Sequence, residues 1–208
     1  MLKFDGVKKS YGSHLILDVP SLEINTGIYW LKGGNGSGKS TLLKMASGII
    51  PFEGEIMIDS VNLKRSPVEY RNLVSYAEAE PVYPSYISGL DLINFYQKIR
   101  KEEKQKTSQL IELFGIGTYY KDSIGTYSSG MLKKLSLVLA FIGNVKYIFL
   151  DEPLVTIDQK SLPIIYKLIS ECLETGTNLV FTSHQPIEYN GLRPAIELEA
   201  SGGTVRFL

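Results

Sequence analysis

A short segment near the start of the chain has the residue types and spacing of a phosphate-binding loop. The pattern G-x-x-x-x-G-K-[ST] is met by Gly33-Gly34-Asn35-Gly36-Ser37-Gly38-Lys39-Ser40. Glycines let successive backbone N–H groups turn toward bound phosphates, and the helix expected after the loop presents its positive N-terminal end to them. The Lys39 ammonium can reach the outer phosphates, and the Ser40 hydroxyl can bind Mg²⁺. This segment, with Thr41 after it, therefore predicts a phosphate site.

Two carboxylates follow a strongly apolar segment later in the chain. Residues 147–150 read Tyr-Ile-Phe-Leu and predict a buried strand, and Asp151 and Glu152 come directly after it. An acid at the end of such a strand can hold a metal ion beside a phosphate loop. The second carboxylate can orient and deprotonate an attacking water, which Asp151 cannot do while it belongs to the metal shell. The simpler alternative is that Asp-Glu-Pro only caps a following helix, but the phosphate loop favours the hydrolytic interpretation.

Strands and helices that alternate along the chain must position these residues. Strands are expected over 2–7, 15–19, 22–24, 28–31, 55–58, 73–76, 147–150 and 178–182, with a closing hairpin over 195–198 and 204–207. Helices are expected over 42–46, 132–141 and 162–173, and more than one within 90–114. Apolar runs such as 148–150 and 179–181 are typical of a parallel sheet that is covered on both faces. The sequence therefore predicts an α/β fold with a mostly parallel sheet.

Composition limits the class of protein. The chain has 208 residues, 44% of them hydrophobic, which is enough apolar material for a packed core. Lys and Arg together number 22, as do Asp and Glu, so no basic surplus attracts nucleic acid, and we expect no nucleic-acid partner. The most apolar run, 135–143, is far shorter than the roughly 20 residues of a membrane-spanning helix. A single cysteine, Cys172, and no secretory signal predict a reducing cytosol.

A series of motifs in a fixed order resembles the nucleotide-binding subunit of ATP-binding cassette (ABC) transporters. They are the phosphate loop, Tyr127-Ser128-Ser129-Gly130-Met131, Leu150-Asp151-Glu152-Pro153, Ile157-Asp158 and Thr182-Ser183-His184. The second is similar to the family signature L-S-G-G-Q, in which Ser128 and Gly130 match. The resemblance covers essentially the whole chain. It implies a single domain over 1–208 with the P-loop NTPase fold of ABC ATPases: a mostly parallel core sheet, an N-terminal antiparallel β-subdomain and a helical subdomain over about 85–143.

The resemblance also implies a role for each site residue. ATP and Mg²⁺ are bound at the phosphate loop, with Ser40 and Asp151 as metal ligands. Glu152 activates water, Lys39 meets the outer phosphates, and His184 contacts the γ-phosphate and holds the attacking water. The adenine is expected to stack on Tyr11, for which plain packing of an aromatic ring is the alternative.

Other roles belong to a dimer. In the family, the signature of one subunit closes over the ATP of the other, so Ser128, Ser129 and Gly130 are expected to act on the ATP of a second ABC subunit, identical or related. Asp158 is expected at the subunit interface, with an exposed loop carboxylate as the alternative. The remaining implied partner is an integral membrane permease. It would place the chain in the cytoplasm, on the inner face of the cell membrane.

The sequence departs from the family pattern at the loop that leads into the helical insert. The family has a glutamine near the metal there, in a segment like Y-x-x-Q-E-x, but Ala79 stands at that position. Alanine supplies neither an amide nor a metal ligand, so Glu78 or Glu80 is a candidate substitute. In the signature, Ser129 replaces the first glycine and Met131 replaces the glutamine.

Three alternative functions remain open at this stage. A soluble cassette ATPase acting on DNA or ribosomes would carry a long coiled coil or two cassettes, and neither is present. An ATP-dependent small-molecule kinase would not need the signature or His184. A weakly hydrolysing, ATP-binding regulatory subunit is favoured by Ala79 and Ser129 but opposed by Glu152. The short chain resembles exporter-type bacterial subunits more than importers.

Overall fold

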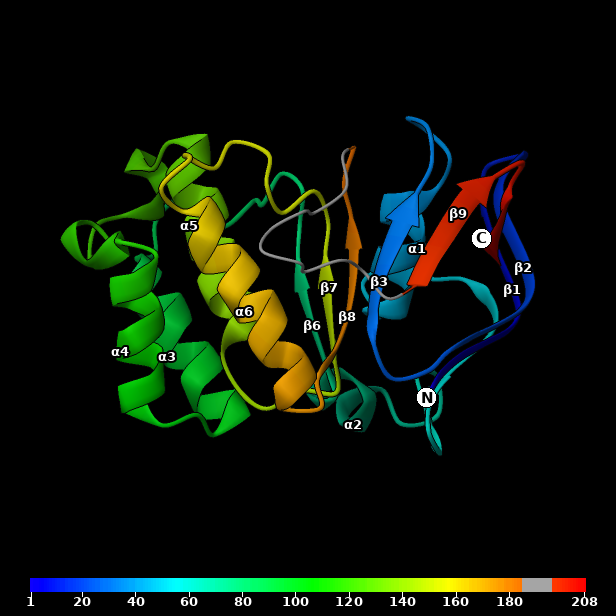
Figure 1. Cartoon of the computed structure of the whole chain (residues 1–208), viewed down its shortest axis with the longest axis horizontal. Coiled ribbons are helices and arrows are strands. Elements are labelled where there is room, and N and C mark those ends of the chain that lie inside the picture. The colour runs from blue at the N-terminus through cyan, green and yellow to red at the C-terminus, as the bar shows by residue number, and fades with distance from the viewer. Residues whose placement is uncertain (185–195) are drawn as a thin grey trace.

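Two β-sheets carry the fold in the computed structural model, which describes residues 1–184 and 196–208 (Figure 1). The larger sheet has the strand order β10 (Thr204–Phe207), β9 (Ile196–Ser201), β3 (Ile28–Lys32), β8 (Asn178–Thr182), β7 (Tyr147–Leu150) and β6 (Val74–Ala77). All neighbouring pairs are parallel except β9 and β10. The expected mostly parallel sheet and the antiparallel closing hairpin are confirmed, although residue 195, expected in the hairpin, lies outside the described residues.

The central strands are apolar throughout because both of their faces are covered. In β3, Tyr29 and Leu31 belong to one hydrophobic core, whereas Ile28 and Trp30 belong to a second core. The first core includes α1 (Lys39–Ala46), and the second includes α5 (Ser129–Phe141) and α6 (Leu162–Glu174). Figure 1 shows α6 in front of the sheet and α1 behind β3. The sheet is therefore a middle layer, which explains its long apolar runs.

The smaller sheet is antiparallel and confirms the expected N-terminal β-subdomain. Its strand order is β2 (His14–Ile24), β1 (Leu2–Tyr11), β4 (Glu53–Ile58) and β5 (Val61–Asn62). The expectation of two separate strands over 15–19 and 22–24 is wrong, because β2 continues through Pro20. This strand lies at the edge of its sheet and Pro20 is exposed, so the missing backbone N–H interrupts no ladder.

The helices between β6 and β7 form the expected helical insert. They are α3 (Gly89–Arg100), α4 (Lys104–Leu113), the 3-10 helices η1 (Ile116–Thr118) and η2 (Ile124–Thr126), and α5. Figure 1 shows them gathered at the end of the molecule away from the smaller sheet. The structure also contains α2 (Pro67–Asn72) before β6, which hydrophobic periodicity did not predict.

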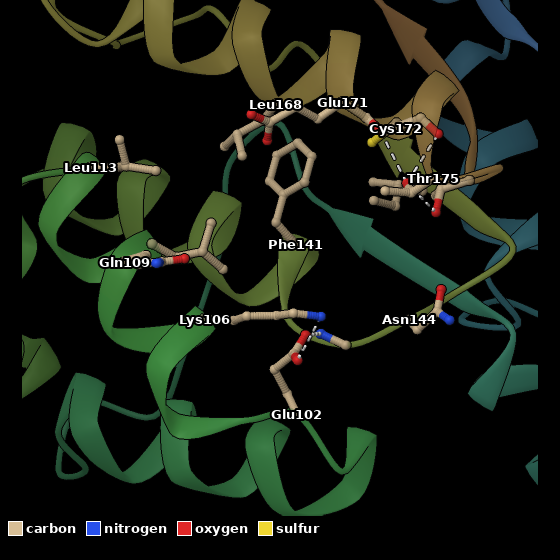
Figure 2. A pocket seen from close by; sticks show the side chains of 14 residues that line it. Glu102, Lys106, Gln109, Leu113, Phe141, Asn144, Leu168, Glu171, Cys172 and Thr175 are labelled. Atoms are coloured by element: carbon tan, nitrogen blue, oxygen red, sulfur yellow. Dashed lines mark hydrogen bonds and ion pairs between the residues drawn. The ribbon is translucent and has the colours of Figure 1, made fainter.

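A cavity of about 450 Å³ lies between part of the insert and α6 (Figure 2). Leu113 and Phe141 form part of its apolar wall on the insert side, and Leu168 and Cys172 line it from α6. Burial raises the pKa of the Cys172 thiol to about 12, so the thiol is protonated at neutral pH. This cavity has no residue in common with the phosphate-loop region described below.

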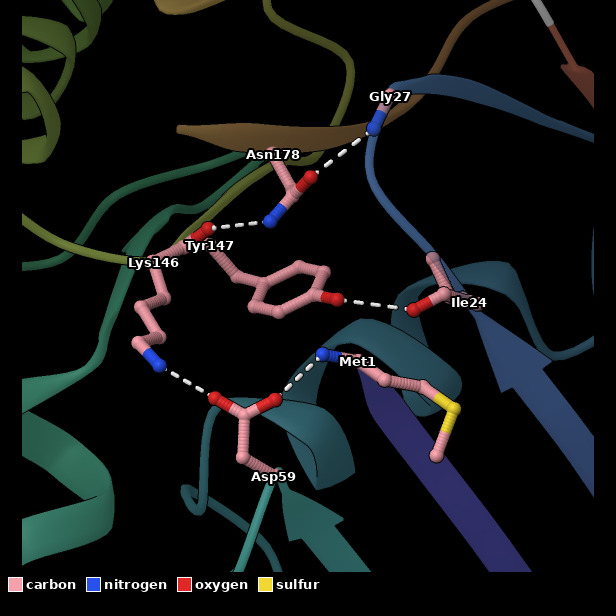
Figure 3. Close-up of polar contacts among 7 residues, drawn as sticks. All are labelled: Met1, Ile24, Gly27, Asp59, Lys146, Tyr147 and Asn178. Carbon is pink, nitrogen blue, oxygen red and sulfur yellow. Dashed lines mark hydrogen bonds and ion pairs between the residues drawn. The ribbon is translucent and has the colours of Figure 1, made fainter. Parts of the chain in front are cut away.

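Polar contacts at the N-terminal ends of β7 and β8 join the two sheets (Figure 3). The Tyr147 hydroxyl donates to the Ile24 carbonyl over 2.8 Å, and the Asn178 side chain joins Gly27 N (2.9 Å) to the Lys146 carbonyl (3.0 Å). Asp59 forms ion pairs with the Lys146 ammonium and with the amino group of residue 1. These cations, Lys146 first, hold the pKa of Asp59 below its usual range. The strand ends are thus fixed relative to the smaller sheet.

Candidate active site

The phosphate loop joins β3 to α1 in a conformation that requires glycine at two places. At Gly33, φ is +151°, and an added Cβ would lie 2.4 Å from Ser37 Oγ and 2.5 Å from the Ala200 carbonyl oxygen. Gly38 is the N-cap of α1 with φ +96°, and an added Cβ would lie 2.8 Å from Leu17 Cγ. Any larger side chain would therefore open the loop or strain its backbone.

The polar groups of the loop fit an anion. The Lys39 ammonium lies over the loop, where it donates to the carbonyls of Gly33 (2.8 Å) and Gly34 (3.1 Å). The Ser37 hydroxyl oxygen is buried and has no protein hydrogen-bond partner. A buried hydroxyl with no partner is costly unless a ligand satisfies it. Together with the N-terminus of α1, these groups are arranged to receive phosphate oxygens.

A cavity of about 460 Å³ brings the loop together with two other motifs. It is lined by Ile16, Asn35, Gly36, Ser37, Gly38, Lys39, Ser40, Thr41, Glu152 and His184. The loop follows β3, and Glu152 and His184 follow β7 and β8, two neighbouring strands of the same parallel sheet. Parallel strands bring their carboxyl ends to one edge, which is where α/β sheets commonly bind ligands.

Asp151 is buried at the end of β7, with 1% of its surface exposed. Thr182 donates its hydroxyl to Asp151 Oδ1 over 2.7 Å, and the Tyr76 hydroxyl donates to Oδ2 over 3.3 Å. The same Thr182 oxygen accepts a hydrogen bond of 2.9 Å from Glu152 N. Burial, with Asp151 nearby, raises the pKa of Tyr76, so this phenol stays a hydrogen-bond donor. The carboxylate is therefore held in one orientation by two neighbouring strands.

Glu152 and His184 lie next to each other in the cavity wall. Glu152 Oε1 and His184 Nε2 are 3.6 Å apart, and the side chains are 16% and 60% exposed. Glu152 has φ +45°, an uncommon conformation for a residue with a side chain. Its backbone N–H is fixed by Thr182, so the turn after β7 points the carboxylate toward the phosphate loop rather than along the strand. A carboxylate and an imidazole in this arrangement can orient and deprotonate a water.

The residues present also suit Mg²⁺. Among the described residues, no group of three or more His, Cys, Asp or Glu side chains forms a metal site. Mg²⁺ commonly takes one or two carboxylates and completes its shell with waters and substrate phosphates. Ser40 lines the phosphate-loop cavity, and Asp151 is buried directly before Glu152, which also lines it, so a carboxylate and a hydroxyl provide that kind of incomplete ligand set.

The signature lies outside this cavity. Ser128 caps α5 by accepting a hydrogen bond from Met131 N (3.3 Å), and both Ser128 and Ser129 are exposed. A Cβ added to Gly130 would lie 3.1 Å from the Thr156 carbonyl oxygen, so the signature adjoins the segment before Asp158. Among the described residues, none of the three signature residues lines the phosphate-loop cavity.

Of the other predicted site residues, Gly33, Gly34, Asp151, Asp158 and Tyr11 also lie outside the cavity lining, and the last two are far from the loop in sequence. The Asp158 carboxylate accepts from Ser161 and pairs with Lys134 over 2.6 Å, and Lys134 contributes most to the low pKa of this carboxyl. Tyr11 is 54% exposed at the end of β1, with the Lys9 ammonium 4.7 Å from its ring centre. The roles of both residues therefore stay predictions.

The loop with the unexpected alanine lies between β6 and the insert. The Glu78 carboxylate pairs with Lys44 over 2.7 Å, and Glu80 is exposed. Of the two candidate substitutes for the missing glutamine, Glu78 is thus the one that an ion pair joins to α1. Glu78 also contributes to the raised pKa of Tyr76, which places it near Asp151.

Sequence reasoning assigned no role to three residues that hydrogen-bond Asp151. Thr182 and Tyr76 hold Asp151, and each lies at the end of a strand next to β7, where sheet order could have indicated them. Lys133 is fully buried in α5, and burial lowers its pKa to about 8, against the opposing effect of Asp151 and other acids. A lysine within the apolar stretch of α5 was the available signal.

Comparison with known proteins places this fold and site in a family. The family model described as "ABC transporter" matches residues 17–155. The linearmycin resistance ATP-binding protein LnrL of Bacillus subtilis is 28% identical over 190 residues, which cover 88% of this chain and 61% of that protein. The lantibiotic transport ATP-binding protein SrtF of Streptococcus pyogenes is 28% identical over 186 residues, 88% of this chain and 80% of that protein. A manganese transport ATP-binding protein, MntB of Listeria innocua, is 29% identical over 196 residues, with the same coverage as SrtF.

Solved structures show the same fold. An ATP-binding subunit of an ABC transporter superposes with a TM-score of 0.88 at 20% identity, covering 100% of this chain and 90% of that one. A dimeric ATP-binding cassette in a post-hydrolysis state with ADP and Pi gives a TM-score of 0.80 at 19% identity, covering 100% and 98%.

The chain belongs to the ABC transporter family. The relatives are named ATP-binding proteins, and the matched region of this chain holds the phosphate loop, the signature and Asp151. Within the described residues, no helix has the length and apolar character needed to cross a membrane.

Proposed function

We propose that this chain hydrolyses ATP as one half of a head-to-tail dimer and so drives substrate movement through a separate membrane permease. One observation carries the proposal: the phosphate loop, Glu152 and His184 share a cavity, whereas the signature is exposed elsewhere on the same chain. A signature that does not reach its own ATP site is suited to closing the site of a second subunit. The full chain would act as a single domain over 1–208.

The site residues divide the chemistry among them. The loop N–H groups and Lys39 bind the phosphates, and Ser40 and Asp151 would hold Mg²⁺, which neutralises charge on the phosphate oxygens when bound. Glu152 accepts a proton from the attacking water, and His184 positions that water against the γ-phosphate. Ser128, Ser129 and Gly130 of the second subunit supply further donors to the same phosphates. Tyr11 would stack on the adenine, and Asp158 would lie at the dimer interface.

The relatives indicate the setting of this activity. Two of them are named for antibiotic resistance or lantibiotic transport and one for manganese transport, so the names do not share one substrate. The two antibiotic-related names favour an exporter of a bulky organic compound. The chain would then lie in the cytoplasm and bind the inner face of the membrane through its permease.

The proposal is tested with Glu152→Gln, which keeps the size of the side chain but removes its basicity. With Mg-ATP this variant should form a dimer that light scattering detects after gel filtration, and with ADP it should stay a monomer. Parent protein should release phosphate, the variant should do so at least 100-fold more slowly, and EDTA should stop release without abolishing ATP binding.

Two control variants separate the parts of the proposal. Lys39→Ala should lose ATP binding, because it removes the charge that meets the outer phosphates. Adding Ser129→Trp to Glu152→Gln should leave ATP binding to the monomer intact but block dimer formation, because the bulky indole would stand where the signature must approach the phosphates. A dimer that still forms in this double variant would contradict the head-to-tail arrangement.

A further inference from the structure

A fully buried ammonium group occupies the junction between the signature helix and the active site. Lys133 is 0% exposed and lies in α5, two residues beyond the signature. A buried charge is strongly unfavourable unless hydrogen bonds replace its hydration. The Lys133 ammonium has such partners, because it donates to the carbonyls of Glu78 (2.7 Å), Ala79 (3.2 Å) and Asp151 (2.8 Å). All three of its protons are accounted for.

These carbonyls belong to two segments that the mechanism needs. Glu78 and Ala79 belong to the loop from β6 into the helical insert, and Asp151 follows β7 directly before Glu152, which lines the phosphate-loop cavity. The segments are already adjacent, because Asp151 N donates to the Ala77 carbonyl over 2.9 Å. Lys133 connects both segments to α5, the helix that begins at the signature.

Backbone carbonyls are informative partners for this lysine. If the acceptors were side chains, a change of their rotamers would break the contact. Because the acceptors are three main-chain carbonyls, the contact fixes the positions of two main-chain segments relative to α5. Since α5 is a continuous helix from Ser129 to Phe141, a displacement at its exposed N-terminus moves Lys133 with it. The loop position where the family resemblance expects a glutamine side chain, Ala79, is itself one of the three residues held.

We infer that Lys133 is a positioning residue for ATP hydrolysis: it links the signature helix to the main chain of Asp151 and of the loop at Ala79, in place of a loop glutamine side chain. The inference rests on the proposed function, because it concerns the same reaction. The movement of the insert is transmitted to the metal-binding aspartate through this junction, and the transmission requires the three hydrogen bonds rather than a side chain at position 79.

The test compares Lys133→Met with Arg100→Met. Arg100 is also a largely buried cation of the insert, and it donates to the carbonyls of Asn72 (2.9 Å) and Val74, near the opposite end of β6. Both variants lose a cation that binds main-chain carbonyls, so both are expected to be less stable. Only Lys133→Met should lower kcat, by at least tenfold, while the Kd for ATP measured in EDTA stays within threefold of the parent. A parental kcat for Lys133→Met, or an equal loss for Arg100→Met, would overturn the inference.

A conservative variant and a second readout separate positioning from folding. Lys133→Gln keeps an amide donor and should hydrolyse ATP at least threefold faster than Lys133→Met; if the methionine variant does not fold, the glutamine variant is compared with Arg100→Met instead. Hydrogen–deuterium exchange of peptides covering 76–81 and 128–134 should respond to ATP together in the parent and in Arg100→Met. In Lys133→Met the response at 128–134 should be lost, and a retained joint response would contradict the link.

Ala79→Gln provides an independent check. It should change the parent's turnover by less than twofold, but in the Lys133→Met background it should restore turnover at least threefold, because the amide re-creates the other connection. If Ala79→Gln did not restore turnover in that background, the idea that Lys133 replaces a glutamine side chain at position 79 would be contradicted. If the parent itself released no phosphate, the proposed function would fail, whereas the ATP-dependent exchange experiment would still decide the role of Lys133.

Discussion

Thr182→Val removes one hydroxyl from the junction of β7 and β8 and keeps the shape of the side chain. In the parent this hydroxyl donates to Asp151 Oδ1 over 2.7 Å and accepts from Glu152 N over 2.9 Å. Thr182 is 0% exposed and Asp151 is 1% exposed, so water cannot readily replace either bond. The variant therefore leaves a buried carboxylate with one donor fewer and an N–H group without its acceptor.

The magnitude follows from these two bonds. A hydrogen bond to a charged group contributes roughly 1.5–3 kcal/mol, and one between neutral groups about 1 kcal/mol. The free energy of unfolding should thus fall by about 3 kcal/mol in Thr182→Val. The matched variant Thr182→Ser keeps the hydroxyl and removes one buried methyl group, which should lower it by about 1 kcal/mol. The two variants should therefore differ by about 2 kcal/mol.

Urea unfolding followed by circular dichroism measures this difference, with an unchanged m-value as the sign that the denatured state is unaltered. Because Thr182 orients both Asp151 and Glu152, the valine variant should also lose at least tenfold in kcat, whereas the serine variant should stay within about threefold of the parent. Equal stability and equal turnover in the two variants would refute the assignment of Thr182 as the residue that orients the Asp151 carboxylate and the main chain of Glu152.

Three further predictions concern other parts of the molecule. Tyr147→Phe removes the buried hydrogen bond to the Ile24 carbonyl and should lower the free energy of unfolding by about 1 kcal/mol in urea, with ATP hydrolysis unchanged. Lys146 lowers the pKa of Asp59, so this carboxylate stabilises the fold above its unfolded pKa of about 3.9, and the benefit is lost as the pH falls through its lower folded value. Asp59→Asn should therefore be less stable than the parent at pH 7, and urea unfolding should show the difference shrink as the pH falls below about 3.9. Cys172, with a pKa of about 12, should react with iodoacetamide at pH 8 at least 100-fold more slowly in the native than in the urea-unfolded protein, as mass spectrometry would show.

The parts of the site that could be predicted are those encoded by neighbouring residues. The phosphate loop and the pair Asp151–Glu152 are continuous in sequence and follow apolar strands, so spacing and residue type indicate both position and chemistry. The parallel sheet was predictable for the same reason, since strands buried on both faces leave continuous apolar runs.

The parts that could not be predicted depend on distant pairs of residues. Asp151 follows β7 and Thr182 ends β8, strands that are neighbours in the sheet but have α6 between them in the sequence. Lys133 and Ala79 are in contact although most of the insert lies between them in the sequence. Residue type alone could not distinguish a lysine bound to three carbonyls from one on a solvated helix face. Pro20 led to the wrong division of β2, because proline ends central strands but is tolerated in an edge strand.

The single tryptophan of the chain occupies an informative place in this fold. Trp30 lies in β3 just before the phosphate loop, 8% exposed and stacked on Phe181 with ring centres 6.4 Å apart. Its indole Nε1 donates to the Ser183 carbonyl over 3.1 Å, next to His184, and the Lys32 ammonium lies 4.2 Å from the ring centre. The tryptophan fluorescence of the protein therefore comes from one residue next to the phosphate loop. Its emission should be that of a shielded indole, and because one hydrogen bond joins it to the residue before His184, we expect nucleotide binding to change this emission in the unlabelled protein.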